Sequence, residues 1–187
     1  DKRNRPLRGY QDNALIYWDL YPKELKDLFT KSFTIGLREP AKRVTENKWL
    51  ETFANMMSCV MVCSNCGAET FYDATKEHFG AVHTCWGCDN TLKVPSKIVI
   101  DKNVVLITEK ANLYSHHINN DFDMNTIVGE VVVNPKNSAL WGIRNLTKTN
   151  WTYIQGDGTQ IPVAPGKAAS IVKKAKIDFG NSVSEFR

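Results

Sequence analysis

Two short cysteine motifs, CSNC at Cys63–Cys66 and CWGC at Cys85–Cys88, are separated by eighteen residues and decide how the middle of this chain folds. Two thiolates that lie two residues apart can turn onto one ion, and two such turns supply four sulfurs at tetrahedral geometry. We therefore predict a zinc site whose ligands are Cys63, Cys66, Cys85 and Cys88. Four sulfur ligands leave no open position for a catalytic water, so the predicted zinc is structural.

Other arrangements of this region stay open at the level of sequence. The cysteines could form two disulfides, remain free buried thiols or bind iron, which also accepts four thiolates. His78 or His83 could replace one cysteine as a ligand. Cys59 fits a buried small apolar residue in a helix better than a fifth ligand. Gly67 and Gly87 are expected at positions where a tight knuckle requires a positive φ.

The rest of the sequence divides around these motifs into three parts with different composition. Residues 1–60 predict helices: Pro22 marks one helix start, Thr45 marks a second, and Gly36 is expected to end the first helix. Residues 61–95 are too short to own a hydrophobic core, so we expect a zinc ribbon that depends on its metal. Residues 96–187 predict an all-β sandwich, and the whole chain therefore belongs to the α+β class.

The predicted sandwich rests on many short strands separated by turn residues such as Gly156-Asp157-Gly158. Strands at such short intervals are typical of a sandwich or a barrel. The expected strands are Lys97–Ile100, Val104–Thr108, Ile127–Val133, Leu140–Asn145, Trp151–Ile154, Gln160–Val163, Ala168–Val172 and Lys176–Phe179.

Charge and composition exclude several classes of function. The 187 residues carry 24 Lys and Arg against 20 Asp and Glu, a net charge of +4, and no segment concentrates the basic residues. Nucleic-acid binding is therefore not expected. No apolar run approaches the ~20 residues that span a bilayer, so no membrane segment is expected. Cysteines bunched as metal ligands indicate a reducing compartment, which we take to be the cytoplasm.

Signatures of catalysis are missing from the sequence. It holds no GxSxG, no phosphate-binding GxxxxGK[ST] and no HExxH motif, so we expect no enzyme activity from this chain. His116 and His117 are expected in a strand, where adjacent rings point to opposite faces. A hydrolase built on either histidine is the weakest of three functional hypotheses.

The helical part contains WDLYPKEL at Trp18–Leu25, FTIGLREPAKRVT at Phe33–Thr45 and Trp49. In these residues it resembles the end of a eukaryotic-like protein kinase C-lobe. It implies that Arg43 matches a kinase arginine that forms a buried ion pair with the glutamate of the APE motif. That glutamate would lie upstream, and since the chain starts without Met we expect it to be part of a longer protein.

The order of the three parts is similar to that of bacterial Ser/Thr kinases found beside von Willebrand A-type proteins and phosphatases in tellurium-resistance-type gene clusters. Here a kinase tail leads into a Cys-x-x-Cys…Cys-Trp-x-Cys ribbon and then into a β part with VGEV at 128–131 and WGIRNLT at 141–147. The β part resembles a forkhead-associated (FHA) domain. Phosphothreonine recognition in that family uses a Gly-Arg pair, whereas Gly129 is followed here by Glu130.

This resemblance implies an accessory region of a Ser/Thr kinase, with the catalytic parts outside this chain. Its partner would be a protein, such as a phosphoprotein or a von Willebrand A-type protein or phosphatase of the same cluster. Arg144 and Asn145 are the candidate partner-binding residues. The alternative is a free-standing zinc-ribbon adaptor that binds protein or nucleic acid.

Overall fold

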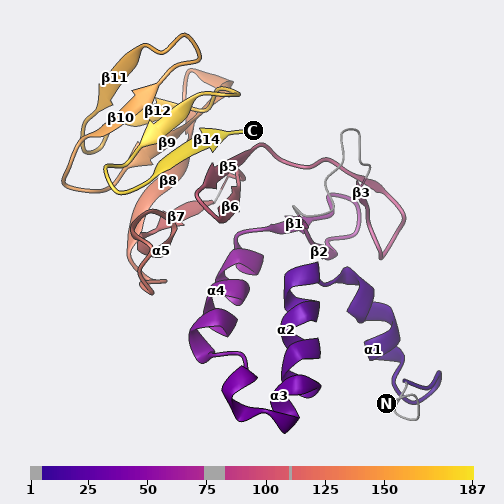
Figure 1. Cartoon of the computed structure of the whole chain (residues 1–187). Helices are drawn as coiled ribbons and strands as arrows, with labels where there is room; N and C mark the ends of the chain where they lie inside the picture. The colour runs from indigo at the N-terminus through magenta and orange to yellow at the C-terminus, as the bar shows by residue number, and fades with distance from the viewer. Residues whose placement is uncertain (1–5, 74–82, 110) are drawn as a thin grey trace. The chain divides into compact units, whose positions relative to one another are not determined.

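The computed structural model describes residues 6–73, 83–109 and 111–187, and the chain divides into two compact units, Asp1–Val94 and Pro95–Arg187. Short helices occur together with antiparallel sheets, which confirms the α+β class (Figure 1). The finer division at residue 60 stays a prediction. No helix among the described residues is both long and apolar enough to cross a bilayer.

The N-terminal unit begins with short helices that start where the sequence predicted. Helix α2 begins directly after Pro22, and α4 begins after Thr45, whose hydroxyl accepts the Lys48 backbone N–H at 3.4 Å. The predicted end at Gly36 is wrong, because α2 already ends at Phe33 and Gly36 lies inside α3. The helical elements are α1 Asp12–Tyr17, η1 Trp18–Leu20, α2 Lys23–Phe33, α3 Ile35–Arg38, η2 Pro40–Lys42 and α4 Glu46–Met57.

Helices α2 and α4 pack through a thin apolar layer. Leu25 and Leu28 of α2 and Met56 of α4 are buried. The ring of Phe29 meets Trp49 edge to face, with centroids 5.0 Å apart. Phe33, Leu50, Phe53 and Met57 of these helices remain exposed, so the two helices bury only part of their apolar surface.

Two small hairpins follow the helices, and each carries one cysteine motif in its turn. Strand β1 (Val60–Val62) pairs with β2 (Glu69–Phe71), and β3 (His83–Thr84) pairs with β4 (Thr91–Leu92). Just after β2, the buried carboxylate of Asp73 accepts the Lys23 backbone N–H at 3.0 Å. Asp73 therefore caps the first turn of α2 from fifty residues away and joins the first hairpin to the helices.

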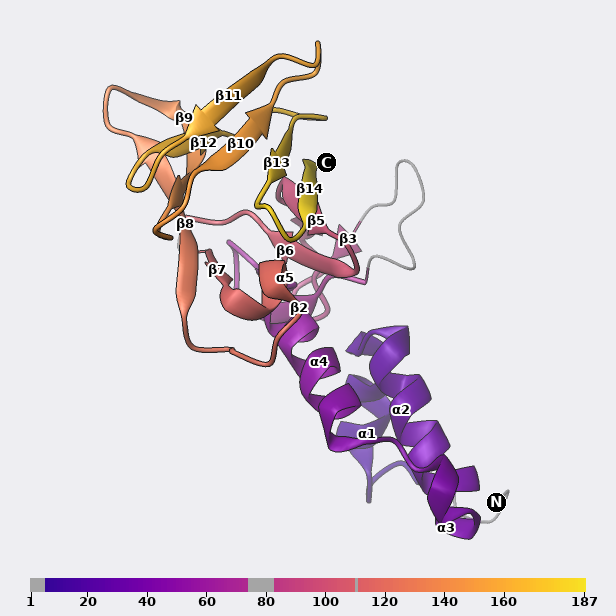
Figure 2. The same cartoon turned by 60° about the vertical axis from the view of Figure 1, so that its left-hand side comes forward.

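The C-terminal unit consists of two antiparallel sheets. One has the strand order β11-β10-β13-β14-β5-β6 and the other the order β12-β9-β8-β7 (Figure 2). The strands are β5 Lys97–Ile100, β6 Asn103–Leu106, β7 Asn112–Tyr114, β8 Ile127–Asn134, β9 Asn137–Asn145, β10 Trp151–Ile154, β11 Gln160–Val163, β12 Ala168–Ser170, β13 Lys176–Asp178 and β14 Val183–Phe186. All eight predicted strands are present, within a few residues of their expected ends.

One continuous core lies between the strands of this unit. Alternate side chains point inward, and Ile98, Ile143 and Ile177 are at most 1% exposed. Trp151 lies among them with its ring edge to face on Phe179, at 4.9 Å between centroids. A Cβ at Gly129 would come 3.0 Å from the Trp151 ring, so the absence of a side chain at this position makes room for the tryptophan.

The histidine pair lies in a helix and not in a strand, which corrects the sequence prediction. Helix α5 (Ser115–Asn119) follows β7 directly (Figure 2). The ring centroids of His116 and His117 lie 3.9 Å apart. The Tyr114 backbone N–H donates to His117 Nδ1 at 2.9 Å. Both histidines are buried.

Candidate metal centre

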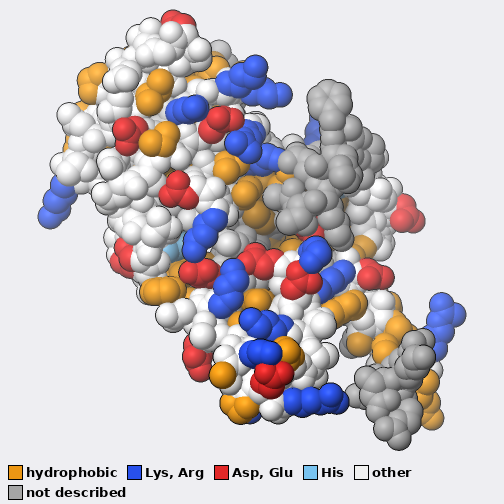
Figure 3. Space-filling view, viewed as in Figure 1, with side chains coloured by type: hydrophobic (Ala, Val, Ile, Leu, Met, Phe, Trp, Pro, Cys, Tyr) orange, Lys and Arg blue, Asp and Glu red, His pale blue; other side chains and the backbone are white. Residues whose placement is uncertain are grey.

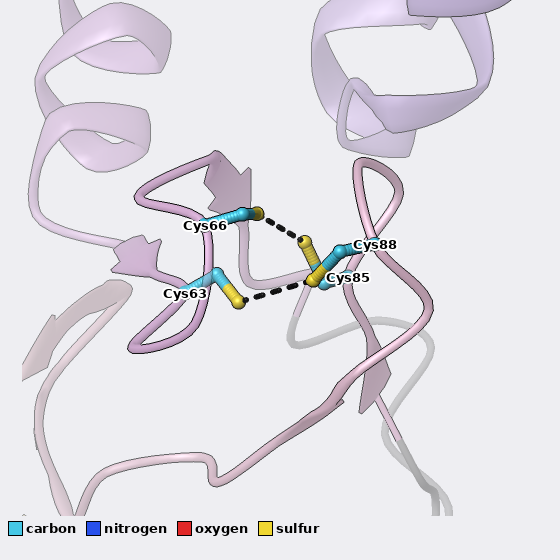
Figure 4. Close-up of side chains that lie close together, drawn as sticks. All are labelled: Cys63, Cys66, Cys85 and Cys88. Atoms are coloured by element: carbon cyan, nitrogen blue, oxygen red, sulfur yellow. Dashed lines mark hydrogen bonds between the residues drawn. The ribbon is translucent and has the colours of Figure 1, made fainter.

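The four predicted cysteine ligands come together (Figure 4). Cys63 Sγ lies 3.7 Å from Cys88 Sγ, Cys66 Sγ lies 3.5 Å from Cys85 Sγ, and all four sulfurs lie within 4.8 Å of one another. Sulfurs placed tetrahedrally at ~2.3 Å from a metal are ~3.8 Å apart, whereas a disulfide needs ~2.05 Å. The sulfurs therefore fit a metal ion, and the two-disulfide alternative does not match these distances.

The two motifs adopt the same backbone turn. In the first, the Gly67 N–H donates to the Cys63 carbonyl at 2.9 Å, and the Cys63 N–H donates to the Ala68 carbonyl. In the second, Asp89 and Asn90 repeat these bonds with Cys85, at 2.9 and 2.8 Å. Each motif is thus a closed knuckle that holds its own pair of sulfurs, and a metal ion would have to join only two rigid parts.

The glycine predictions are right for one knuckle and wrong for the other. Gly67 has a φ of +74°, as expected, but the matching left-handed position in the second knuckle is Asp89, at +57°. Gly87 is needed for space, because a Cβ there would lie 3.3 Å from Ala68 Cβ and 3.5 Å from Cys66 Sγ. The residue therefore lets the first knuckle approach the second.

Hydrogen bonds make the sulfurs unequal. Backbone N–H donors from Cys66 and Asn65 lower the pKa of Cys63 to about 6. The Asn65 side chain donates to Cys88 Sγ at 3.4 Å and lowers the pKa of that thiol. At Cys66 the Ala68 N–H lowers the pKa, but the sulfurs of Cys88 and Cys85 outweigh it and raise the value to about 12. Four such close thiolates repel one another, so a cation would stabilise the set.

Trp86 fastens the second knuckle to the rest of the N-terminal unit. Its indole N–H donates to the Glu69 carbonyl on β2 at 2.9 Å. Its ring meets Tyr17 of α1 edge to face, with 5.4 Å between centroids. Sequence reasoning placed Trp86 in the motif but missed this role, since the contact joins residues far apart in the chain.

The described candidate ligands His83 and Cys59 are not members of the cysteine cluster. His83 lies in β3 with its ring 5.7 Å from Tyr72, and His78 is outside the described residues. Cys59 is buried between α4 and β1, two residues beyond the end of the helix in which it was expected. Within residues 6–73, 83–109 and 111–187, Cys63, Cys66, Cys85 and Cys88 form the only group that could hold a metal ion.

Arg43 holds a turn in the helical part. Its Nε donates to the Gly36 carbonyl at 3.0 Å, and the Gly36 backbone packs close to the Arg43 side chain. In the described part of the chain no carboxylate lies within ion-pair distance of Arg43. The ion pair that the kinase resemblance implies would need a group beyond these residues, and it stays a prediction.

The two candidate partner-binding residues differ in their surroundings. Arg144 on β9 is half exposed and donates to Glu130 Oε1 on β8 at 2.7 Å. Asn145 is fully buried: its Nδ2 donates to the carbonyls of Thr149 and Val163, and its Oδ1 accepts from Thr147. Asn145 therefore positions the loop after β9, while contact of either residue with a partner stays a prediction.

The visible charges are mixed in sign. Lysine and arginine side chains are interspersed with aspartate and glutamate over the described residues of the face in Figure 3.

Comparison with protein-family models, with curated proteins and with solved structures found no match to this chain. The candidate site is therefore argued from its own geometry.

Proposed function

We propose that this chain is a non-catalytic protein-interaction region whose N-terminal unit is stabilised by one structural zinc ion. The four sulfurs within 4.8 Å of one another carry the proposal. Zinc suits four thiolates with no geometric preference of its own, and small hairpins with little core gain their folding energy from such an ion. In this proposal residues 61–95 form a zinc ribbon in a reducing cytoplasm.

Metal stoichiometry tests the zinc part. Protein purified from zinc-supplemented cells should contain one zinc per chain, and cobalt substitution should give the visible absorption of a tetrahedral thiolate site. Cys63→Ser with Cys85→Ser should abolish both signals. Cys59→Ala, which changes a cysteine outside the cluster, should leave them intact. Iron in place of zinc, or zinc retained by the double variant, would contradict the proposal.

The interaction role rests on the C-terminal unit. Two antiparallel sheets around one core support an FHA-like sandwich, and the resemblance to kinase C-terminal regions suggests its context. The partner we propose is a protein, with a phosphoprotein, a von Willebrand A-type protein or a phosphatase as candidates. Arg144 is the exposed cation at the candidate site.

The size of the native protein tests the kinase context. An antibody against this chain, used on lysate from the source cells, should detect a band well above 21.2 kDa if a kinase domain precedes it. A band at 21.2 kDa would contradict the kinase context and favour the free-standing adaptor. The zinc proposal does not depend on this outcome.

A further inference from the structure

A groove lies on the outer face of the four-stranded sheet of the C-terminal unit. It has a volume of about 640 Å³ and is bordered by β8, β9 and β12. Gly142 forms its floor: a Cβ there would come 2.9 Å from the Ala169 carbonyl oxygen, so no side chain fits. Ala168 and Ser170 are small and exposed beside it. The groove therefore exists because three adjacent positions carry little or no side chain.

The groove runs along a strand whose outer edge pairs with no other strand in the described part of the chain. Strand β12 is the last in the order β12-β9-β8-β7. The Asn145 N–H donates to the Lys167 carbonyl, and the Ile171 N–H donates to the Trp141 carbonyl. Since hydrogen-bonding directions alternate along an antiparallel strand, the N–H and C=O groups of Ala168 and Ser170 point away from β9. They form a short row of free donors and acceptors.

Charge defines what could lie in this groove. Its lining includes Lys136, Arg144 and Lys167 but no acidic residue. Glu130 already pairs with Arg144, whereas among the described residues no carboxylate is within ion-pair distance of the two lysines. Exposed Leu140 and Val172 add apolar surface. An extended occupant that presents both acidic and apolar side chains on one face matches this surface.

From these observations we infer that the groove binds an extended acidic segment of a partner protein, which adds a strand to the free edge of β12. The backbone of the segment pairs with Ala168 and Ser170, its carboxylates meet Lys136 and Lys167, and its apolar side chains pack on Leu140 and Val172. A peptide supplies both N–H donors and carbonyl acceptors, while a nucleic-acid backbone supplies only acceptors at its phosphates. The inference rests on the proposed interaction function and names the surface and the chemistry of the partner.

The test uses the full zinc-loaded chain and a defined probe. The probe is a fluorescein-labelled peptide of about eight residues, the length of an ordinary strand, in which every second position is threonine and the positions between carry glutamate and valine in turn, so that glutamate and valine share one face. A second peptide has lysine in place of glutamate. Fluorescence anisotropy measures affinity for wild type, for Lys136→Glu with Lys167→Glu, and for Lys148→Glu. Lys148 is exposed in the loop after β9 and lies outside the groove lining, so it is the matched control.

We expect the acidic peptide to bind and the basic one not to bind. The double variant should weaken binding by about tenfold or more, because two attractions become repulsions. Lys148→Glu should keep wild-type affinity. Saturating peptide should also slow amide hydrogen exchange at Ala168 and Ser170, which mere electrostatic attraction would not do.

Three results would overturn the inference: equal affinity of the double variant, unchanged exchange at β12, or equally tight competition by single-stranded oligouridylate, which would indicate a general polyanion patch. A chain that binds one zinc ion but does not bind the acidic peptide would contradict the groove inference and leave the zinc proposal standing. Failure to load zinc would contradict the proposed function, whatever the peptide does.

Discussion

The two units of this chain are stabilised in different ways. The C-terminal unit has a continuous core in which Ile98, Ile100 and Ile177 are completely buried. The hairpins of the N-terminal unit have strands of two or three residues and meet at four sulfurs. An isolated two-stranded hairpin is only marginally stable in water. One unit thus depends on buried apolar area, whereas the other, in the function proposed above, depends on a metal ion held by its four cysteines.

Because of this difference, a treatment that destabilises one unit should leave the stability of the other unchanged. Loss of a metal removes the link between two knuckles but no part of the apolar core. Loss of a core side chain has the opposite effect. Amide hydrogen exchange measured across the whole chain can report both units in one experiment, and the following predictions use it.

Metal removal is expected to have the largest effect. A strong chelator, or Cys63→Ser with Cys85→Ser, should expose the backbone of residues 61–95 to exchange, because binding of a structural zinc is worth on the order of 10 kcal/mol. Exchange in β5, β10 and β13 should not change. Cooperative unfolding of the N-terminal unit that stays the same after complete metal removal would contradict the comparison.

Trp151→Ala should produce the reverse pattern. Trp151 is 1% exposed, and removal of such a side chain leaves a large cavity, so the C-terminal unit should lose about 3–5 kcal/mol. Urea titration followed by exchange in β10 and β13 measures this loss. Zinc content should remain at the wild-type level. Val183→Ala, at an exposed position, is the control and should cost well under about 1 kcal/mol.

Acid should weaken the C-terminal unit through its histidine pair. Burial, with a smaller contribution from His116, lowers the pKa of His117 to about 3, while an unfolded histidine titrates near ~6.5. The unfolded chain therefore binds more protons below pH ~6.5, and stability should fall by up to about 2 kcal/mol at pH 5. Exchange of α5 and β7 amides at several pH values measures the slope. His117→Asn should flatten the dependence of stability on pH. A slope equal to that of wild type would contradict the assignment of this acid sensitivity to His117.

Asp73→Ala should give the smallest effect. The Asp73 carboxylate caps the first turn of α2, and loss of such a cap costs about 1 kcal/mol. Faster exchange at Lys23 and the following amides, with zinc still bound, is the expected signature. Asp27→Ala removes only an exposed pair with Lys23 and serves as the control. If Asp73→Ala and Asp27→Ala give the same exchange rates at Lys23 and the following amides, Asp73 does not join the hairpin to the helices.

Local sequence signals predicted local structure well. The starts of α2 and α4, the strands β10 and β11 and the grouping of four cysteines all follow from patterns within a few residues. The spacing of the cysteines is enough to identify the cluster, because each knuckle is closed by bonds within itself.

The features that sequence reasoning missed depend on contacts between distant segments. Strand β14 lies between β13 and β5, and its alternating Ser184 and Phe186 give a weak signal alone. Helix α5 is five residues long and is held by a single turn of side-chain and backbone bonds. The reason for Gly87 is the approach of the opposite knuckle, which no pattern within CWGC reveals.

The eighteen residues between Cys66 and Cys85 also impose an order of events in time. Each knuckle can close on itself within about 1–10 μs, the timescale of hairpin formation. If the four cysteines bind zinc as proposed, joining the two knuckles requires closure of the longer loop and the arrival of an ion by diffusion. The supply of free metal, and not the speed of the chain, would then determine how fast a newly made N-terminal unit reaches its folded state.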